Sequence, residues 1–130
     1  MISQRDFEAL SEFRCTLAKF LRFSERAARR AGITPTQYLL LLHIRGYPGR
    51  RAATVGELAR RLQASPHGTA ALIARGVASR LVEKRRGQGD QRRVEVVLTA
   101  RGRELVERIA QQHRAELQSL RDVFRVAHIS

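Results

Sequence analysis

Two helix starts that follow each other almost without a gap constrain this chain more than any other feature. Thr54 begins one helix with a capping box, because Glu57 stands three positions later. Ser65 begins the next helix, with Pro66 at the first helical position, where a proline is well tolerated. Only two residues lie between Leu62, the last apolar position of the first helix, and Ser65. Two helices joined by so tight a turn predict a helix-turn-helix unit.

Helical periodicity also marks the segments before and after this unit. Residues 7–31 repeat apolar side chains along one side of a helical wheel until Gly32, a residue suited to a helix end. Residues 34–37, Thr-Pro-Thr-Gln, begin a second helix that is apolar nearly all round and is therefore expected at the centre. Thr99 can cap a last helix. The apolar stripe of that helix exceeds what so small a domain buries alone, so a dimer interface is expected to cover Leu105, Ile109, His113, Leu117, Leu120 and Phe124.

The segment between the helix-turn-helix unit and the last helix is expected to be a β-hairpin. Here the apolar period changes from 3.6 to 2, with Val94, Val96 and Leu98 alternating with other residues. A Gly-Gln-Gly-Asp turn at residues 87–90 precedes them. Between residues 75 and 103, nine basic residues against three acidic ones give a charge of +6, nearly half of the chain's +13. The hairpin is therefore predicted to be strongly basic.

Composition narrows the choice of partner and compartment. The 130 residues fit one domain, and 23 of the 25 basic residues are Arg, whose planar guanidinium suits phosphates and guanine edges. A polyanion is therefore the first partner to consider. Acidic residues among the first apolar ones argue against a signal peptide, and no apolar run approaches the roughly 20 residues that cross a bilayer. Cys15, the single cysteine, cannot form an intrachain disulfide and fits a reducing, cytoplasmic location.

Three short motifs occur along the chain in a specific order. Residues 33–38, Ile-Thr-Pro-Thr-Gln-Tyr, begin the second helix, and residues 55–59, Val-Gly-Glu-Leu-Ala, begin the third. In the hairpin, Asp90-Gln91-Arg92 is followed by Val97-Leu98-Thr99 and then by Gly102. Their order and spacing resemble the multiple-antibiotic-resistance regulator (MarR) family of winged helix-turn-helix transcription regulators. The resemblance extends over essentially the whole chain.

This resemblance implies a mainly α fold with a small β-hairpin wing, in one domain that spans residues 1–130. Residues 34–98 would form the winged helix-turn-helix core. Terminal helices at 5–31 and 100–126 would form the interface of a homodimer. The implied partner is double-stranded DNA with a pseudo-palindromic operator sequence, with the fourth helix in the major groove and the wing tip in the minor groove.

Two groups of residues are the candidate DNA contacts that the resemblance implies. The recognition helix would contribute Ser65, Pro66, His67, Thr69, Ala70 and Arg75. The wing would contribute Lys84, Arg85, Arg86, Asp90, Arg92 and Arg93. Alternatives remain open, since Ser65 can be only a helix cap, Thr69 can face the core, and a basic run is often only a solvated surface.

The fourth helix departs from the family's usual sequence at several positions. Few side chains suited to reading bases occur on it, with His67 for a purine edge and alanines for a thymine methyl group. Gly76 stands where the family usually buries Leu, which predicts a loosely packed recognition helix. Arg80 replaces a glycine that is common before the first wing strand.

Small molecules and redox chemistry enter as further hypotheses. The resemblance implies a small aromatic effector, for which Phe13, Leu17, Phe20 and Tyr38 are the candidate pocket, with ordinary core packing as the alternative. Cys15 falls opposite the apolar stripe of the first helix, where it is either a redox sensor or an incidental surface cysteine.

No constellation of residues suggests an enzyme. The four histidines are scattered without the spacing of a metal site, and no phosphate-binding loop or nucleophile elbow occurs. Neither a cofactor nor a metal is therefore expected. Together with the resemblance, the sequence favours a dimeric transcription regulator, and the resemblance implies a repressor released by an effector. A non-specific architectural nucleic-acid-binding protein, a redox-sensing regulator acting through Cys15, and a protein-interaction module are the alternatives.

Overall fold

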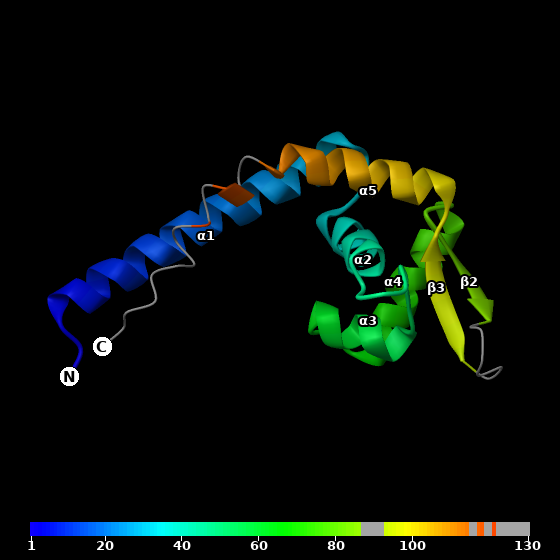
Figure 1. Ribbon diagram of the computed structural model, residues 1–130, viewed down its shortest axis with the longest axis horizontal. Helices are drawn as coiled ribbons and strands as arrows, with labels where there is room; N and C mark the ends of the chain where they lie inside the picture. The colour runs from blue at the N-terminus through cyan, green and yellow to red at the C-terminus, as the bar shows by residue number, and fades with distance from the viewer. Residues whose placement is uncertain (87–92, 115–116, 119–120, 122–130) are drawn as a thin grey trace.

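Helices dominate the part of the chain that the structure, a computed structural model, describes: residues 1–86, 93–114, 117–118 and 121. The elements shown in Figure 1 are, in chain order, α1 (Gln4–Arg30), α2 (Pro35–Arg45), β1 (Ala52–Ala53), α3 (Val55–Leu62), α4 (Pro66–Ala78), β2 (Val82–Arg86), β3 (Val94–Leu98) and α5 (Ala100–Gln112). The predicted order of four helices, a hairpin and a last helix is confirmed. The fold is mainly α with a small antiparallel sheet, of the winged helix-turn-helix type.

The central helices begin at the predicted capping residues. The Thr34 hydroxyl accepts a hydrogen bond from the Gln37 N–H at 3.1 Å, and the Gln37 side chain accepts one from the Thr34 N–H at 3.0 Å. Thr54 and Glu57 repeat this reciprocal pair at 3.2 and 2.9 Å. Because each pair satisfies two N–H groups that the helix itself leaves without acceptors, these residues fix where α2 and α3 begin.

A three-stranded antiparallel sheet carries the wing, with the strand order β1-β3-β2. β2 and β3 pair from Val82 opposite Leu98 to Arg86 opposite Val94, so the predicted hairpin is confirmed. The two-residue strand β1, which pairs with β3, was not predicted from the sequence. Two alanines show no alternation of polar and apolar residues, so the sequence carries no signal for this strand.

α2 lies at the centre of the core, as its nearly continuous apolar sequence predicts. Leu40, Leu41 and Ile44 are almost fully buried, and α2 packs against α1, α3, α4, α5 and β3. Leu39 is the exception, with 41% of its surface exposed. One side of α2 therefore remains at the molecular surface.

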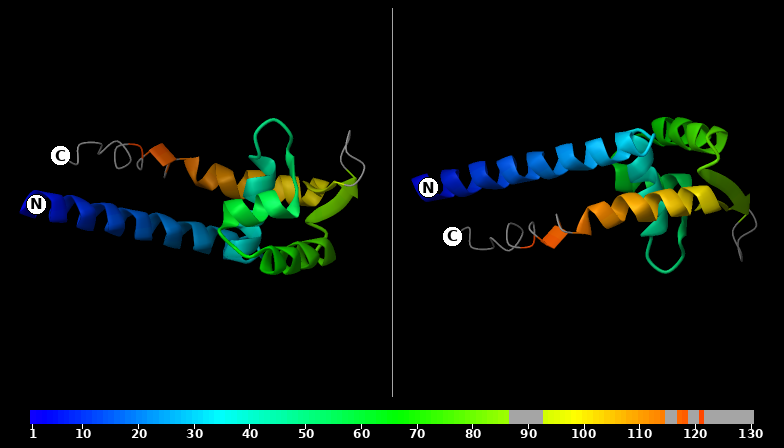
Figure 2. Two further views of the ribbon diagram at one scale, coloured as in Figure 1. Left: turned by 90° about the horizontal axis from the view of Figure 1, so that it is seen from below. Right: turned by 90° about the horizontal axis from the view of Figure 1, so that it is seen from above.

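α1 extends far beyond the winged helix-turn-helix body (Figures 1 and 2). Its C-terminal end packs against α2 and α5, and Ala27 and Ala28 are the only residues of this helix that are buried. Its N-terminal half projects away from the body in both views of Figure 2. Phe7 and Leu10 on this half are 57% and 48% exposed. A single chain therefore leaves apolar side chains of α1 uncovered.

The last helix follows its predicted stripe only in part. Leu105 and Ile109 are buried in the core, whereas Leu117 is exposed. α5 ends at Gln112 instead of continuing unbroken to residue 126. Leu120 and Phe124 lie outside the described residues.

Two interpretations of the sequence are wrong in the structure. Gly76 does not loosen α4, because a Cβ atom built on it would lie 3.0 Å from Cγ2 of Val82, so the glycine allows α4 to approach β2 closely. His113 is not left at the surface for a dimer seam, since only 4% of it is exposed within one chain. Its ring stacks on Tyr38 with 5.5 Å between the centroids, and its Nδ1 lies 2.8 Å from the carbonyl oxygen of Ile109.

Candidate nucleic-acid interface

α3 and α4 form the predicted helix-turn-helix unit. Gln63 ends α3 in the left-handed conformation with φ of 54°, and the N–H of Ala64 returns to the carbonyl oxygen of Ala59 at 3.0 Å. The Ser65 hydroxyl then accepts a hydrogen bond from the N–H of Gly68 at 3.0 Å. The turn is closed by backbone hydrogen bonds, and Ser65 acts as the cap of α4.

The exposed side of α4 is composed mostly of small side chains. The predicted contact residues that lie on it are Ser65, Pro66, His67, Ala70 and Arg75. Thr69 is 1% exposed, and its hydroxyl donates a hydrogen bond to the Ser65 carbonyl oxygen at 2.8 Å. The prediction that Thr69 contacts DNA is therefore wrong, and its alternative, a side chain that faces the core, is confirmed.

Strand β2 carries three exposed cations beside α4, namely Lys84, Arg85 and Arg86. Lys84 lies opposite Val96 and Arg85 lies opposite Glu95 in the antiparallel register. Because successive side chains of a strand point to opposite faces, these cations project from both faces of the wing. The predicted tip residues Asp90 and Arg92 lie outside the described residues.

A cluster of charged groups connects the wing with α3. Glu57 accepts hydrogen bonds on one carboxylate oxygen from the Tyr47 hydroxyl at 2.8 Å, from Arg50 at 2.5 Å and from Arg93 at 3.2 Å. Arg50 also donates to Glu95 at 3.3 Å. We call Tyr47, Arg50, Glu57, Arg93 and Glu95 the Glu57 cluster. It joins the loop between α2 and β1, the first turn of α3, and β3.

The Glu57 carboxyl is strongly acidic in this environment. Burial opposes its ionisation, but hydrogen bonds from the Thr54 backbone, from Tyr47 and from Arg50 outweigh burial and lower the pKa of Glu57 from 4.5 to about 2. The Tyr47 ring is itself flanked by the guanidinium carbons of Arg50 and Arg61, at 4.9 and 5.2 Å from its centroid. Glu57 is therefore ionised and paired at neutral pH.

Sequence reasoning finds only part of this cluster. It assigns Glu57 to the helix cap and Arg93 to the DNA contacts, and it does not single out Tyr47 or Arg50. The available signal is Glu95, an acidic residue within the basic hairpin, which requires a cationic partner if it faces inward.

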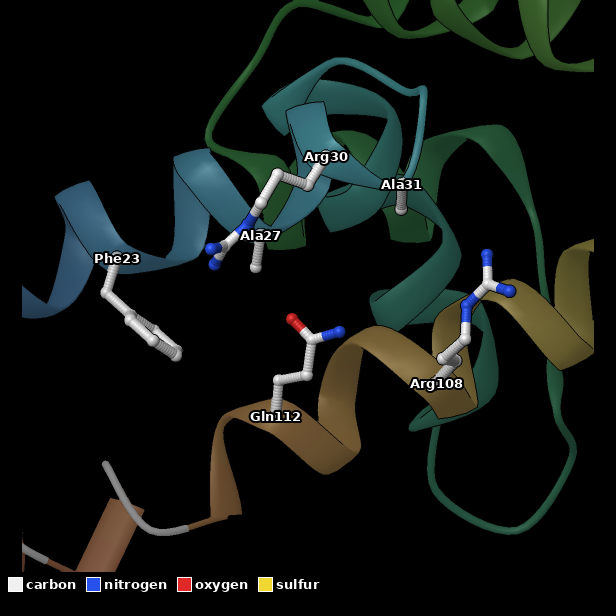
Figure 3. Close-up of a pocket in the computed structure, with 6 residues that line it drawn as sticks. All are labelled: Phe23, Ala27, Arg30, Ala31, Arg108 and Gln112. Atoms are coloured by element: carbon white, nitrogen blue, oxygen red, sulfur yellow. The ribbon is translucent and has the colours of Figure 1, made fainter.

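A cleft of about 760 Å³ lies between α1 and α5 (Figure 3). The residues that line it are Phe23, Ala27, Arg30, Ala31, Arg108 and Gln112. None of the four predicted effector-pocket residues lines this cleft. Figure 3 shows that α1 and its C-terminal cap, Ala31, contribute four of the lining side chains and α5 the other two.

Two of the predicted pocket residues instead pack around His113. Tyr38 is 4% exposed and stacks on the imidazole, while Phe20 meets it edge-on with 5.8 Å between the centroids. The alternative of core packing is therefore confirmed for Tyr38. Phe13 and Leu17 are half-buried on α1, nearer to its N-terminus.

The remaining hypotheses concern isolated features. Cys15 is exposed on α1 and forms no disulfide. Within the described ranges, no three His, Cys, Asp or Glu residues lie close enough together to hold a metal ion. In the same part of the chain, no helix has the length and apolar character needed to span a membrane.

A model of the MarR family matches residues 31–93, which contain α2, the helix-turn-helix unit and most of the wing. Over these residues the chain is similar to the MarR family. No curated protein sequence matches the chain.

Solved structures of MarR family proteins extend the similarity to almost the entire fold. AbsC, a MarR family transcriptional regulator from Streptomyces coelicolor, is 21% identical with a TM-score of 0.71, and the match covers 95% of this chain and 81% of AbsC. A MarR family protein from Bacillus stearothermophilus is 21% identical with a TM-score of 0.77, and the match covers 93% and 84% of the two chains. A mutant of MarR from E. coli, solved in complex with operator DNA, is 22% identical with a TM-score of 0.66, and the match covers 89% and 79%. The MarR fold therefore includes α1 and α5 as well as the matched segment.

Proposed function

We propose that this chain is a DNA-binding transcription regulator that acts as a homodimer. One observation supports this most strongly: the outer surface of α4 lies beside a strand with three exposed cations, on a fold similar to that of a MarR protein solved with operator DNA. In helix-turn-helix proteins the second helix of the unit enters the major groove. Here that helix is α4, and its contacts are Ser65, Pro66, His67, Ala70 and Arg75.

The wing adds contacts to the phosphates and to the minor groove. Lys84, Arg85 and Arg86 supply positive charge on β2, and Asp90 and Arg92 follow them in the sequence as further proposed contacts. A narrow minor groove has an enhanced negative potential that attracts Arg side chains. Such contacts give affinity and a strong dependence on salt, whereas base contacts from α4 give sequence preference.

The dimer interface is proposed to comprise the terminal segments 5–31 and 100–126, outside the winged helix-turn-helix core of 34–98. Exposed Phe7, Leu10 and Leu21 on α1 support this division, since the described residues of one chain leave them uncovered. Two copies related by a twofold axis would present two α4 helices to half-sites about 34–36 Å apart, or a multiple of that spacing.

Regulation by a small molecule is part of this proposal. The cleft between α1 and α5 lies where a dimerisation helix meets the body that carries α4. A ligand that binds better to one arrangement of these parts shifts the population toward it. If the arrangement that the ligand favours places the two α4 helices at the wrong spacing, the protein releases DNA. The protein then represses transcription only in the absence of the ligand.

A second function, non-specific architectural binding, is favoured by the small side chains of α4. Besides His67, the exposed positions at its centre include Ala70, Ala71 and Ala74, which donate no hydrogen bonds to bases. A protein of this kind would bind through phosphates alone.

Selection from a random DNA pool separates these two functions. A regulator is expected to enrich a pseudo-palindromic sequence and to bind it at least about a thousandfold more tightly than random DNA. An architectural protein would enrich no sequence but would still bind all duplexes with a steep salt dependence. Weak binding to every duplex at low salt would contradict both.

A further inference from the structure

Two arginines near the wing are held by the protein's own carboxylates. Arg50 contacts Glu57 and Glu95, and Arg93 contacts Glu57 at 3.2 Å. Both carboxylate side chains are 10% exposed, while the side chains of Arg50 and Arg93 are 34% and 45% exposed. A guanidinium that is already paired with a carboxylate offers less charge to a phosphate. These two arginines therefore differ from Lys84, for which the described residues provide no ion pair.

The Glu57 cluster lies where the wing meets the helix-turn-helix unit. Glu57 is in the first turn of α3, Glu95 is within β3, and Arg93 stands directly before β3. Arg50 reaches both carboxylates from the loop that precedes β1. Because β1 pairs with β3 over only two residues, the backbone alone ties this loop weakly to the wing. The side chains of the cluster add the contacts that connect loop, wing and α3.

We propose that the Glu57 cluster holds the wing in the orientation that fits DNA, with Glu57 as a positioning residue and Arg93 acting through Glu57. This inference rests on the DNA-binding function proposed above. Moving the loop and the wing away from α3 would leave the nearly buried Glu57 carboxylate without its two arginine partners, which is strongly unfavourable. The wing and α3 therefore move as one unit, and the cations of β2 keep a fixed place relative to α4.

Neutralisation of Glu57 changes the affinity for DNA, and the direction of this change distinguishes a positioning role from a simple effect of charge. Glu57→Gln adds one unit of positive net charge, removes the carboxylate partner of Arg93 and leaves Arg50 with Glu95 alone, so charge alone predicts tighter binding to the selected duplex. Positioning predicts weaker binding, by roughly tenfold, because groups in one ionic network couple by amounts of this order. Gln at this position still completes the capping box, so α3 keeps its start.

Glu83→Gln is the matched control. Glu83 is exposed on β2, and its replacement changes the net charge by the same amount at a wing position outside the Glu57 cluster. The Glu83→Gln variant is expected to bind DNA at least as tightly as the unmodified protein. Binding by Glu57→Gln that equals or exceeds binding by Glu83→Gln would overturn the proposal.

A double-mutant cycle tests the role of Arg93. Arg93→Gln alone is expected to weaken DNA binding, but in the Glu57→Gln background it should cause little further loss, because the contact is already broken. If Arg93→Gln reduces the affinity for DNA by the same factor with Glu57 and with Gln at position 57, Arg93 contacts DNA directly. That result would remove Arg93 from the proposal.

The orientation of the wing can also be measured without DNA. In a Cys15→Ser background, spin labels at Arg60→Cys on α3 and Lys84→Cys on β2, both exposed positions, report the distance between α3 and the wing. A narrow distance distribution is expected in the parent and with Glu83→Gln, and a broader or shifted one with Glu57→Gln. An unchanged distribution with Glu57→Gln would overturn the proposal. Because no DNA is involved, failure to bind any duplex would instead count against the proposed function.

Discussion

Gly102 stands where the last helix passes closest to the start of the wing. A Cβ atom on Gly102 would overlap the carbonyl oxygen of Leu81 and lie 3.0 Å from its carbonyl carbon. That carbonyl accepts a hydrogen bond from the N–H of Thr99 at 3.1 Å, so the backbone cannot move away without losing this bond. We expect Gly102→Ala to lower the free energy of unfolding in urea by at least about 3 kcal/mol, the upper part of the range for overpacked positions.

Gly56 provides the matched control for this substitution. It also lies near the start of a helix, but nothing lies within 4 Å of a Cβ atom built there. Gly56→Ala is therefore expected to raise the free energy of unfolding by roughly 0.5–1 kcal/mol, since alanine favours helices. Equal effects of the two substitutions would contradict the close contact between Gly102 and Leu81.

The ionisation of Glu57 makes the stability of the fold depend on pH in the acid range. Its pKa of about 2 in the folded state lies below the ordinary 4.5, so its ionisation stabilises the fold fully above about pH 4.5, and this stability is lost as the pH falls through about 2. The contribution is on the order of 3 kcal/mol. Urea unfolding across this pH range should therefore show a smaller acid-induced loss of stability for Glu57→Gln than for the parent. Parallel losses in the two proteins would contradict the lowered pKa.

At the scale of elements, the sequence predicts helix starts better than it predicts packing between elements. The starts of α2, α3, α4 and α5 are encoded locally, because a Ser or Thr supplies the missing hydrogen bond within three residues. Packing depends on residues far apart in sequence. The close approach of Gly76 to Val82 and the burial of His113 beneath Tyr38 therefore escape a local pattern.

The connection between α4 and β2 carries an arginine in a conformation that suits glycine. Arg80 has φ of 61°, in the left-handed region that side chains with a Cβ atom rarely adopt. Its N–H donates to the Val77 carbonyl oxygen at 3.0 Å and its own carbonyl oxygen accepts from the Thr99 hydroxyl at 2.6 Å, which hold it there. We expect Arg80→Gly to raise the free energy of unfolding by about 1 kcal/mol.

Arg80→Gln separates backbone strain from charge. It removes the same positive charge as Arg80→Gly but keeps the Cβ atom, so it should leave the strain in place and raise stability little. Equal stabilisation by both variants in thermal or urea unfolding would show that repulsion between cations, not backbone conformation, is the cause.

At the scale of the whole molecule, α1 is long, amphipathic and largely uncovered. Leu10 is 48% exposed on its apolar side. If α1 forms the dimer interface, Leu10→Glu places a charge there and should shift the protein toward monomer in sedimentation equilibrium. Ser11→Glu, which adds the same charge at the neighbouring, exposed position on another side of the helix, should leave the dimer intact. Dissociation by both variants, or by neither, would contradict an interface on the apolar side of α1.

The candidate nucleic-acid interface is only partly predictable from sequence, because some of its contacts join residues that lie far apart in the chain. The basic strand is contiguous, so Lys84, Arg85 and Arg86 stand out as a group. The Glu57 cluster instead combines residues from three separate segments, and only the folded chain brings them together. Sequence patterns identify the cations, whereas the structure distinguishes the paired cation Arg93 from Lys84.

The salt dependence of DNA binding tests the central claim, that the wing and α4 bind a DNA duplex, most directly. For the selected duplex, the plot of log affinity against log salt concentration should be shallower by about two units for the double variant Lys84→Gln, Arg85→Gln than for the unmodified protein, because two phosphate contacts are lost. A slope that is unchanged in this variant would contradict the account.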